Sequence, residues 1–125
     1  MTTNIKIIHA HDFIKATPEG QLDFEKTKII IMEIAAALEG LVDHQVILDT
    51  RKAQAEISIT DLWHLAAELG KYQKTFSQKM AVICPLTRFD FAGFFALCAQ
   101  NRGFNVMAFT SIDEALDWLI APPDA

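Results

Sequence analysis

The sequence lacks the features of secreted and membrane-spanning proteins. Only two of its 125 residues are cysteines, Cys84 and Cys98, which is too few for a disulfide framework. Both follow apolar patterns, so we interpret them as buried free thiols. No apolar run approaches the ~20 residues that span a bilayer, and the N-terminus lacks the long apolar stretch of a signal peptide. We therefore expect a cytoplasmic protein without stable membrane insertion.

Positive charge and catalytic motifs are also scarce. Eleven basic against sixteen acidic residues give a net charge of −5, so nucleic acid is not an expected partner. The five glycines are isolated, which excludes a glycine-rich phosphate loop, and no G-x-S-x-G motif occurs. His9 and His11 alternate along one predicted strand, but no third metal ligand lies nearby. We expect no cofactor, no metal and no enzymatic activity.

The length and composition indicate one folded domain. A chain of 125 residues with 51% hydrophobic residues can bury its own core. We expect a single domain over residues 1–120 and a flexible tail over 121–125, where Pro122 and Pro123 end the last helix.

Apolar periodicity predicts strands that alternate with helices. The first two strands should pair as antiparallel neighbours and end at a turn over residues 17–20. Three isoleucines at 29–31 suit either a helix that starts at Asp23 or a strand. Later helices should start at Ser58, Asp90 and Ser111, after strands near residues 46–48, 80–84 and 105–109. The order β-β-α-β-α-β-α-β-α predicts an α/β fold with a mixed, mostly parallel sheet.

A group of polar residues follows two of the predicted strands. Ligands of open α/β sheets bind beyond the carboxyl ends of the strands, so these residues mark a candidate edge for a ligand or partner. Asp49 and Arg51 should point the same way in an extended segment. Arg51 could hold a carboxylate or phosphate, but we favour a structural ion pair with Asp61. The candidate edge comprises Asp49, Arg51, Ser58, Asp61, Arg88 and Asp90.

Ser58 has two interpretations. As the first residue of Ser58-Ile-Thr-Asp61 it suits an N-cap, which we favour. As a phosphorylation site it would place a dianion beside the positive end of a helix dipole.

Phenylalanines are concentrated in the second half of the chain. Six of the nine lie between residues 89 and 109. Helical spacing puts some of them on a core face, yet such a cluster could also line an apolar pocket or a dimer face. The candidate pocket residues are Phe91, Phe94, Phe95 and Phe109.

The chain resembles the STAS superfamily, and within it the stand-alone, SpoIIAA-like bacterial proteins. The resemblance rests on ordered segments at residues 46–51, 61–62, 80–85, 91–104 and 106–119. It implies a regulatory domain without catalysis that binds proteins, nucleotides or apolar small molecules. Members of the family switch partners when a serine in an Asp-Ser-Ser-Gly motif is phosphorylated. Here Ser58 lacks both the glycine and the acidic residue before it.

Two functional hypotheses follow. In the first, the candidate edge of a regulatory or interaction domain meets a protein partner or a second copy of the chain in a homodimer. In the second, the domain carries or senses an apolar, lipid-like molecule between the sheet and the helix that contains Phe91–Cys98. An apolar cavity would favour the second hypothesis, and a solid interior would exclude it.

Overall fold

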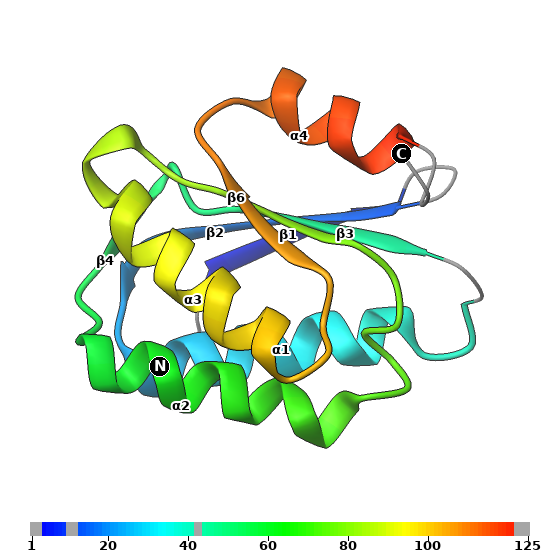
Figure 1. The fold of residues 1–125 in the computed structure, drawn as a ribbon, viewed down its shortest axis with the longest axis horizontal. Helices are drawn as coiled ribbons and strands as arrows, with labels where there is room; N and C mark the ends of the chain where they lie inside the picture. Colours follow the sequence, from blue (N-terminus) through cyan, green and yellow to red (C-terminus); the bar gives the residue numbers. More distant parts are fainter. Residues whose placement is uncertain (1–3, 10–12, 42–43, 122–125) are drawn as a thin grey trace.

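The computed structural model describes residues 4–9, 13–41 and 44–121, apart from the side chains of 4–9. Three helices pack against one face of a central sheet and one helix packs against the other, an arrangement that can be followed in Figure 1. In chain order the elements are β1 (Asn4–His9), β2 (Phe13–Leu22), α1 (Phe24–Leu38), β3 (Gln45–Asp49), β4 (Ala53–Ala55), α2 (Ile59–Leu69), β5 (Met80–Ile83), α3 (Phe89–Asn101), β6 (Val106–Phe109) and α4 (Ile112–Ile120), with short 3-10 turns at Gly70–Tyr72 and Leu86–Arg88.

The sheet has the mixed, mostly parallel arrangement that the sequence predicts. The strand order is β1-β2-β3-β5-β6. β1 pairs with β2 in the antiparallel sense, and the β2–β3, β3–β5 and β5–β6 pairs are parallel. The short strand β4 was not predicted; it pairs with the end of β2, where Gly20 faces Ala53. Three residues are too few to show an apolar alternation, so the sequence carries little signal for β4.

The predicted turn at residues 17–20 is wrong, because β2 runs through it to Leu22. β2 pairs with β3 over Phe13–Ala16 and with β4 over Gly20–Leu22. Pro18 falls between these two stretches, where a missing backbone N–H disturbs neither pairing. Its side chain is fully buried in the core.

Local capping sets the start of three helices as predicted. The Asp23 carboxylate accepts a hydrogen bond from the Lys26 backbone N–H at 2.8 Å, and α1 follows, so residues 29–31 are helical. Ser58 and Ser111 accept equivalent bonds from the backbone N–H groups three residues ahead. Each bond satisfies one of the N–H groups that a helix start leaves without a partner.

The predicted Asp90 cap is wrong. α3 begins at Phe89, and Asp90 lies exposed in its first turn. The 3-10 turn Leu86–Arg88 leads directly into α3, so Arg88 occupies the N-cap position and no described side chain caps the helix.

Buried apolar side chains form two clusters, one on each face of the sheet. The larger cluster lies between the sheet and helices α1, α2 and α3, and the smaller one joins Ile47, Ala81 and Ile83 to α4. Cys84 and Cys98 are buried free thiols, as predicted. Within the described ranges, no helix is long and apolar enough to cross a membrane.

Candidate functional site

The carboxyl ends of β3 and β5 meet at one edge of the molecule. Asp49 lies opposite Ile83 in the register of the two strands. Just beyond, the Thr50 backbone N–H and its side-chain hydroxyl both donate to the Ile83 carbonyl oxygen at 2.8 Å. Thr50 therefore joins the ends of the two strands and fixes the turn that leads into β4.

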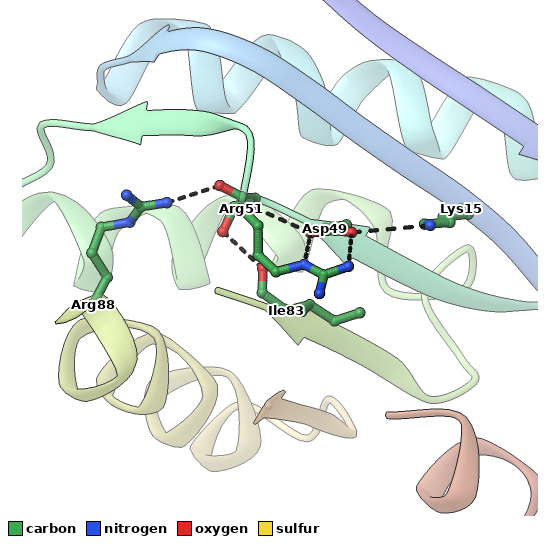
Figure 2. Close-up of polar contacts among 6 residues, drawn as sticks. Lys15, Asp49, Arg51, Ile83 and Arg88 are labelled. Atoms are coloured by element: carbon green, nitrogen blue, oxygen red, sulfur yellow. Dashed lines mark hydrogen bonds and ion pairs between the residues drawn. The ribbon is translucent and has the colours of Figure 1, made fainter. Parts of the chain in front are cut away.

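Asp49 is buried at this edge and is held by Arg51. The Arg51 Nε donates to Asp49 Oδ1 at 3.0 Å and Nη2 donates to Oδ2 at 2.8 Å (Figure 2). The Arg51 backbone N–H also donates to Oδ1 at 3.1 Å. On the other side, Lys15 Nζ lies 4.0 Å from Oδ2. This two-pronged geometry is the strong form of a charged hydrogen bond.

The same contacts set the ionisation of Asp49. Burial alone would raise the pKa of the carboxyl group. The hydrogen bonds from Arg51, with the positive charges of Arg51 and Lys15, outweigh burial and hold the pKa below the usual value of 3.8. Asp49 is therefore an anion at neutral pH whose charge is already satisfied within the protein.

The predicted ion pair between Arg51 and Asp61 is wrong. Arg51 pairs with Asp49, two residues away, and among the described side chains no ion pair joins it to Asp61. The backbone N–H of Asp61 instead donates to the Ser58 hydroxyl at 3.1 Å. Arg51 pairs with Asp49 because the turn that follows β3 already brings the Arg51 backbone N–H to the Asp49 carboxylate, so the side-chain pair needs no further ordering of the chain.

Arg88 reaches the candidate edge from the start of α3. Its Nη2 donates to the Thr50 backbone carbonyl at 2.8 Å, the contact drawn from Arg88 in Figure 2. The same Nη2 donates to the Ala53 carbonyl at 3.1 Å, across the turn between β3 and β4. The Ala53 N–H closes that turn by donating to the Thr50 carbonyl at 3.0 Å. Arg88 thus connects α3 to the β3–β4 turn.

The candidate edge is therefore only partly a free surface. Asp49 is enclosed, and Asp61 and Arg88 are half-buried. Arg51, Ser58 and Asp90 are exposed. Of these, Ser58 caps α2 through its hydroxyl oxygen, as the sequence predicts.

An apolar cavity of about 310 Å³ lies between the sheet and helices α1, α2 and α3. We call it the sheet–helix cavity. Its polar lining is limited to a few groups, among them Thr27, Thr50, Glu56 and Arg88. The apolar walls include Ile30, Ile31 and Ile34 of α1, Leu62, Leu65 and Leu69 of α2, Leu48, Met80 and Val82 of the sheet, and Phe91, Ala92 and Phe95 of α3.

The structure separates the four phenylalanines of the predicted pocket. Phe91 and Phe95 line the sheet–helix cavity, with Phe91 46% exposed. Phe94 packs against the larger core outside the lining. Phe109 lies on the opposite face of the sheet, where its ring centroid is 5.5 Å from that of Trp118. A strand alternates its two faces, so β6 could not send this ring to the α3 side without a change of register.

Two parts of the site leave no recognisable signal in the sequence. Most of the cavity wall is aliphatic, and the aliphatic residues that α1 and α2 contribute to it follow the spacing of ordinary core residues. Lys15 lies on β2, 34 positions before its partner Asp49, and only the parallel β2–β3 pairing brings the two together.

Metal and thiol chemistry have little support in the geometry. Among the described residues, no three His, Cys, Asp or Glu side chains form a group that could hold a metal. The side chains of His9 and His11 lie outside the described part of the chain. Cys84 lines the sheet–helix cavity, and burial raises the pKa of its thiol, although the positive charge of Arg88 opposes the effect. A thiol with a raised pKa is a poor nucleophile at neutral pH.

Comparison with known proteins places the fold. The sequence matches no protein-family model and no curated protein. An uncharacterised DUF3478-family protein with a SpoIIAA-like fold from Shewanella loihica PV-4 is 19% identical, with a TM-score of 0.61 and 94% of each chain covered. An anti-sigma factor antagonist from Mycobacterium paratuberculosis is 16% identical, with a TM-score of 0.58 and 96% of each chain covered.

A third solved structure is similar over the same length. The anti-sigma factor antagonist SpoIIAA, in its unphosphorylated form, is 13% identical, with a TM-score of 0.55 and coverage of 95% of this chain and 100% of SpoIIAA. These identities are too low to transfer an activity. The chain has the SpoIIAA-like fold, as the order of its sequence motifs predicts.

Proposed function

We propose that this chain is a regulatory domain without catalytic activity that binds a small apolar molecule in the sheet–helix cavity. The observation that carries the proposal is the cavity itself, at about 310 Å³. Protein interiors are close-packed, with few voids larger than a water molecule. A mostly apolar space of this size falls at the lower end of the range of ligand pockets, ~300–1,000 Å³.

The regulatory part of the proposal draws on the fold. Two of the similar solved structures are described as anti-sigma factor antagonists, which act on other proteins rather than on a substrate. This argument is an analogy between folds, so it supports the class of function and not a particular partner.

The position of the cavity supports a link between a bound molecule and the candidate edge. Thr50 and Arg88 line the sheet–helix cavity, and both also fix the turn between β3 and β4. A molecule in the cavity would therefore touch the residues that shape the edge. A ligand shifts a conformational equilibrium only through such differential contacts.

Native mass spectrometry tests the proposal directly. We expect the protein, purified under mild conditions, to retain an apolar molecule, and the stripped protein to bind 1-octanol in a calorimetric titration. The control is Ala92→Leu, which extends a larger side chain into the cavity from α3. A protein without retained mass that also fails to bind 1-octanol would contradict the proposal.

A second candidate function is docking of a protein partner at the candidate edge. The exposed Ser58 hydroxyl at the start of α2 favours it, because a phosphate there would meet the positive end of the helix dipole. Mass spectrometry after incubation with a cognate kinase tests this switch, and an unmodified Ser58 would end it.

Homodimer formation and a cytoplasmic location stay predictions. Trp63 is 48% exposed on α2 and suits a partner surface, although the Arg102 guanidinium covers part of its ring at 5.0 Å. A molecular mass in solution that does not change with concentration would count against the dimer.

A further inference from the structure

Arg88 places a positive charge at the wall of an apolar cavity. Its side chain is half-buried and lines the sheet–helix cavity together with Phe91 and Ala92, which lie in the first turn of α3, directly after Arg88. A cation beside apolar walls normally has a carboxylate partner, because removing a charge from water is costly.

Among the side chains that the structure describes, the guanidinium group of Arg88 has no such partner. Its Nη2 donates to two neutral carbonyl oxygens, those of Thr50 and Ala53. Among the described side chains, none forms an ion pair with Arg88, and its Nε and Nη1 donate no hydrogen bond to a described residue. The two carbonyls fix the orientation of the planar group while its charge stays available. This contrasts with Arg51, whose charge is neutralised by Asp49.

The other charged and polar groups around Arg88 leave room for an anion. Glu56 also lines the cavity, but its side chain is exposed and can turn into solvent. Asp90 is exposed in the first turn of α3. No described side chain caps α3, so the positive end of its dipole adds to the charge of Arg88. Cys84 contributes a neutral thiol nearby.

We propose that the sheet–helix cavity binds an aliphatic monocarboxylate, with the carboxylate paired to Arg88 and the hydrocarbon chain among the apolar walls. The inference rests on the proposed function and names its ligand class. A volume of about 310 Å³ holds roughly ten non-hydrogen atoms at about 30 Å³ each, which suits a chain of about eight carbons. A guanidinium group matches a carboxylate through two parallel hydrogen bonds.

Calorimetric titration of stripped wild-type protein at neutral pH separates the two proposals. The probes are octanoate, 1-octanol and octylamine, which share a chain and differ in head group. We expect octanoate to bind about tenfold more tightly than 1-octanol, because a charged hydrogen bond is worth more than a neutral one. Octylamine should bind most weakly, because its charge repels that of Arg88.

Variants of Arg88 test whether this residue reads the head group. Arg88→Gln should remove the preference for octanoate, so that octanoate and 1-octanol bind this variant with affinities within about twofold of each other. Arg88→Lys keeps the charge and loses the planar fork, so an intermediate preference is expected. The matched control, Glu56→Gln, changes another lining residue and should keep or strengthen the preference. In wild-type protein, octanoate but not 1-octanol should shift the NMR resonance of the Arg88 Nε–H group.

The outcomes distinguish the two proposals. Equal affinity of wild-type protein for octanoate and 1-octanol would overturn the role of Arg88 and keep the apolar-ligand function. A loss of affinity for both probes in Arg88→Gln and Arg88→Lys, without a change in selectivity, would assign Arg88 a purely structural role. Failure of every probe to bind the wild-type protein would overturn both proposals.

Discussion

Arg51 grips the buried carboxylate of Asp49 through Nε at 3.0 Å and Nη2 at 2.8 Å, at the point where β3 ends. Arg51 neutralises the charge of Asp49 inside the fold, so Asp49 is not free to pair with a ligand or partner. Arg88, on the connection after β5, instead donates to the carbonyl oxygens of Thr50 and Ala53 and pairs with no carboxylate among the described residues. The difference between these two arginines separates a structural contact from a candidate binding group.

Asp49→Asn should lower the stability of the domain by about 2 kcal/mol at neutral pH. The neutral amide loses the charge that Arg51 and Lys15 stabilise. Urea unfolding of both proteins measures the difference. Asp117→Asn is the control, because Asp117 is exposed on α4, and it should change stability by less than about 0.5 kcal/mol.

The effect of Asp49→Asn on stability should depend on pH. The pKa of Asp49 is lower in the folded protein than the usual 3.8, so the carboxylate stabilises the fold at pH values above the unfolded pKa. That contribution declines as the pH falls below 3.8 and is lost once the pH passes the folded pKa. The stability gap between wild-type protein and Asp49→Asn should therefore close in acid, and a gap that is constant with pH would contradict this account.

Ser58→Ala should cost about 1 kcal/mol, because the hydroxyl oxygen caps the backbone N–H of Asp61. Ser58→Asp should recover most of this loss, since aspartate is an equally good cap. Ser111→Ala is a matched control, because Ser111 caps α4 in the same way. Thermal unfolding measures all three, and a Ser58→Ala variant as stable as wild type would show that the cap contributes nothing.

Ala92→Leu should stabilise the protein by about 0.5–1 kcal/mol while it blocks the sheet–helix cavity. The larger side chain fills space that apolar walls already surround, and leucine suits the helical position in α3. Val82→Ala, which enlarges the same cavity from the sheet side, should instead cost about 1–2 kcal/mol. Chemical unfolding of the pair gives opposite signs if the cavity is empty space, and a destabilised Ala92→Leu would mean that the site is already filled by packing.

Lys79→Ala should weaken the attachment of α4 by about 1–2 kcal/mol. Lys79 Nζ donates to the carbonyl oxygens of Trp118 at 2.7 Å and Ala121 at 2.9 Å, where a helix end leaves acceptors without partners. Lys74→Ala, at an exposed position, is the control. Hydrogen exchange of the α4 amides should quicken only in the first variant, and equal protection in both would refute the assignment.

The elements were largely predictable because their signals are local. Asp23, Ser58 and Ser111 each bond the backbone three residues ahead, so the chain needs no distant partner to start those helices. The prediction of a cap at Asp90 was wrong. Aspartate is a common N-cap residue, but the preceding 3-10 turn leads into the helix before Asp90 is reached. The turn predicted at Pro18 was wrong because the place of this proline within β2 depends on which strands lie beside it.

The candidate edge was predictable in position and only partly in chemistry. Asp49, Arg51 and Arg88 do meet near the carboxyl ends of β3 and β5, as parallel strands require. The carboxylate that pairs with Arg51 is set by distances in the folded structure. This pairing decides which charges remain for a ligand.

The sequence by itself determined the α/β class and the order of the main elements, because hydrophobic periodicity and helix caps act over a few residues. The SpoIIAA-like fold was predicted from the resemblance of ordered segments to that family. Only the tertiary structure decided that Arg51 pairs with Asp49, that no carboxylate of the described residues pairs with Arg88, and that about 310 Å³ stays open between the sheet and its helices. Packing between distant segments sets these features, and a linear pattern of residue types holds no measure of the space that such packing leaves.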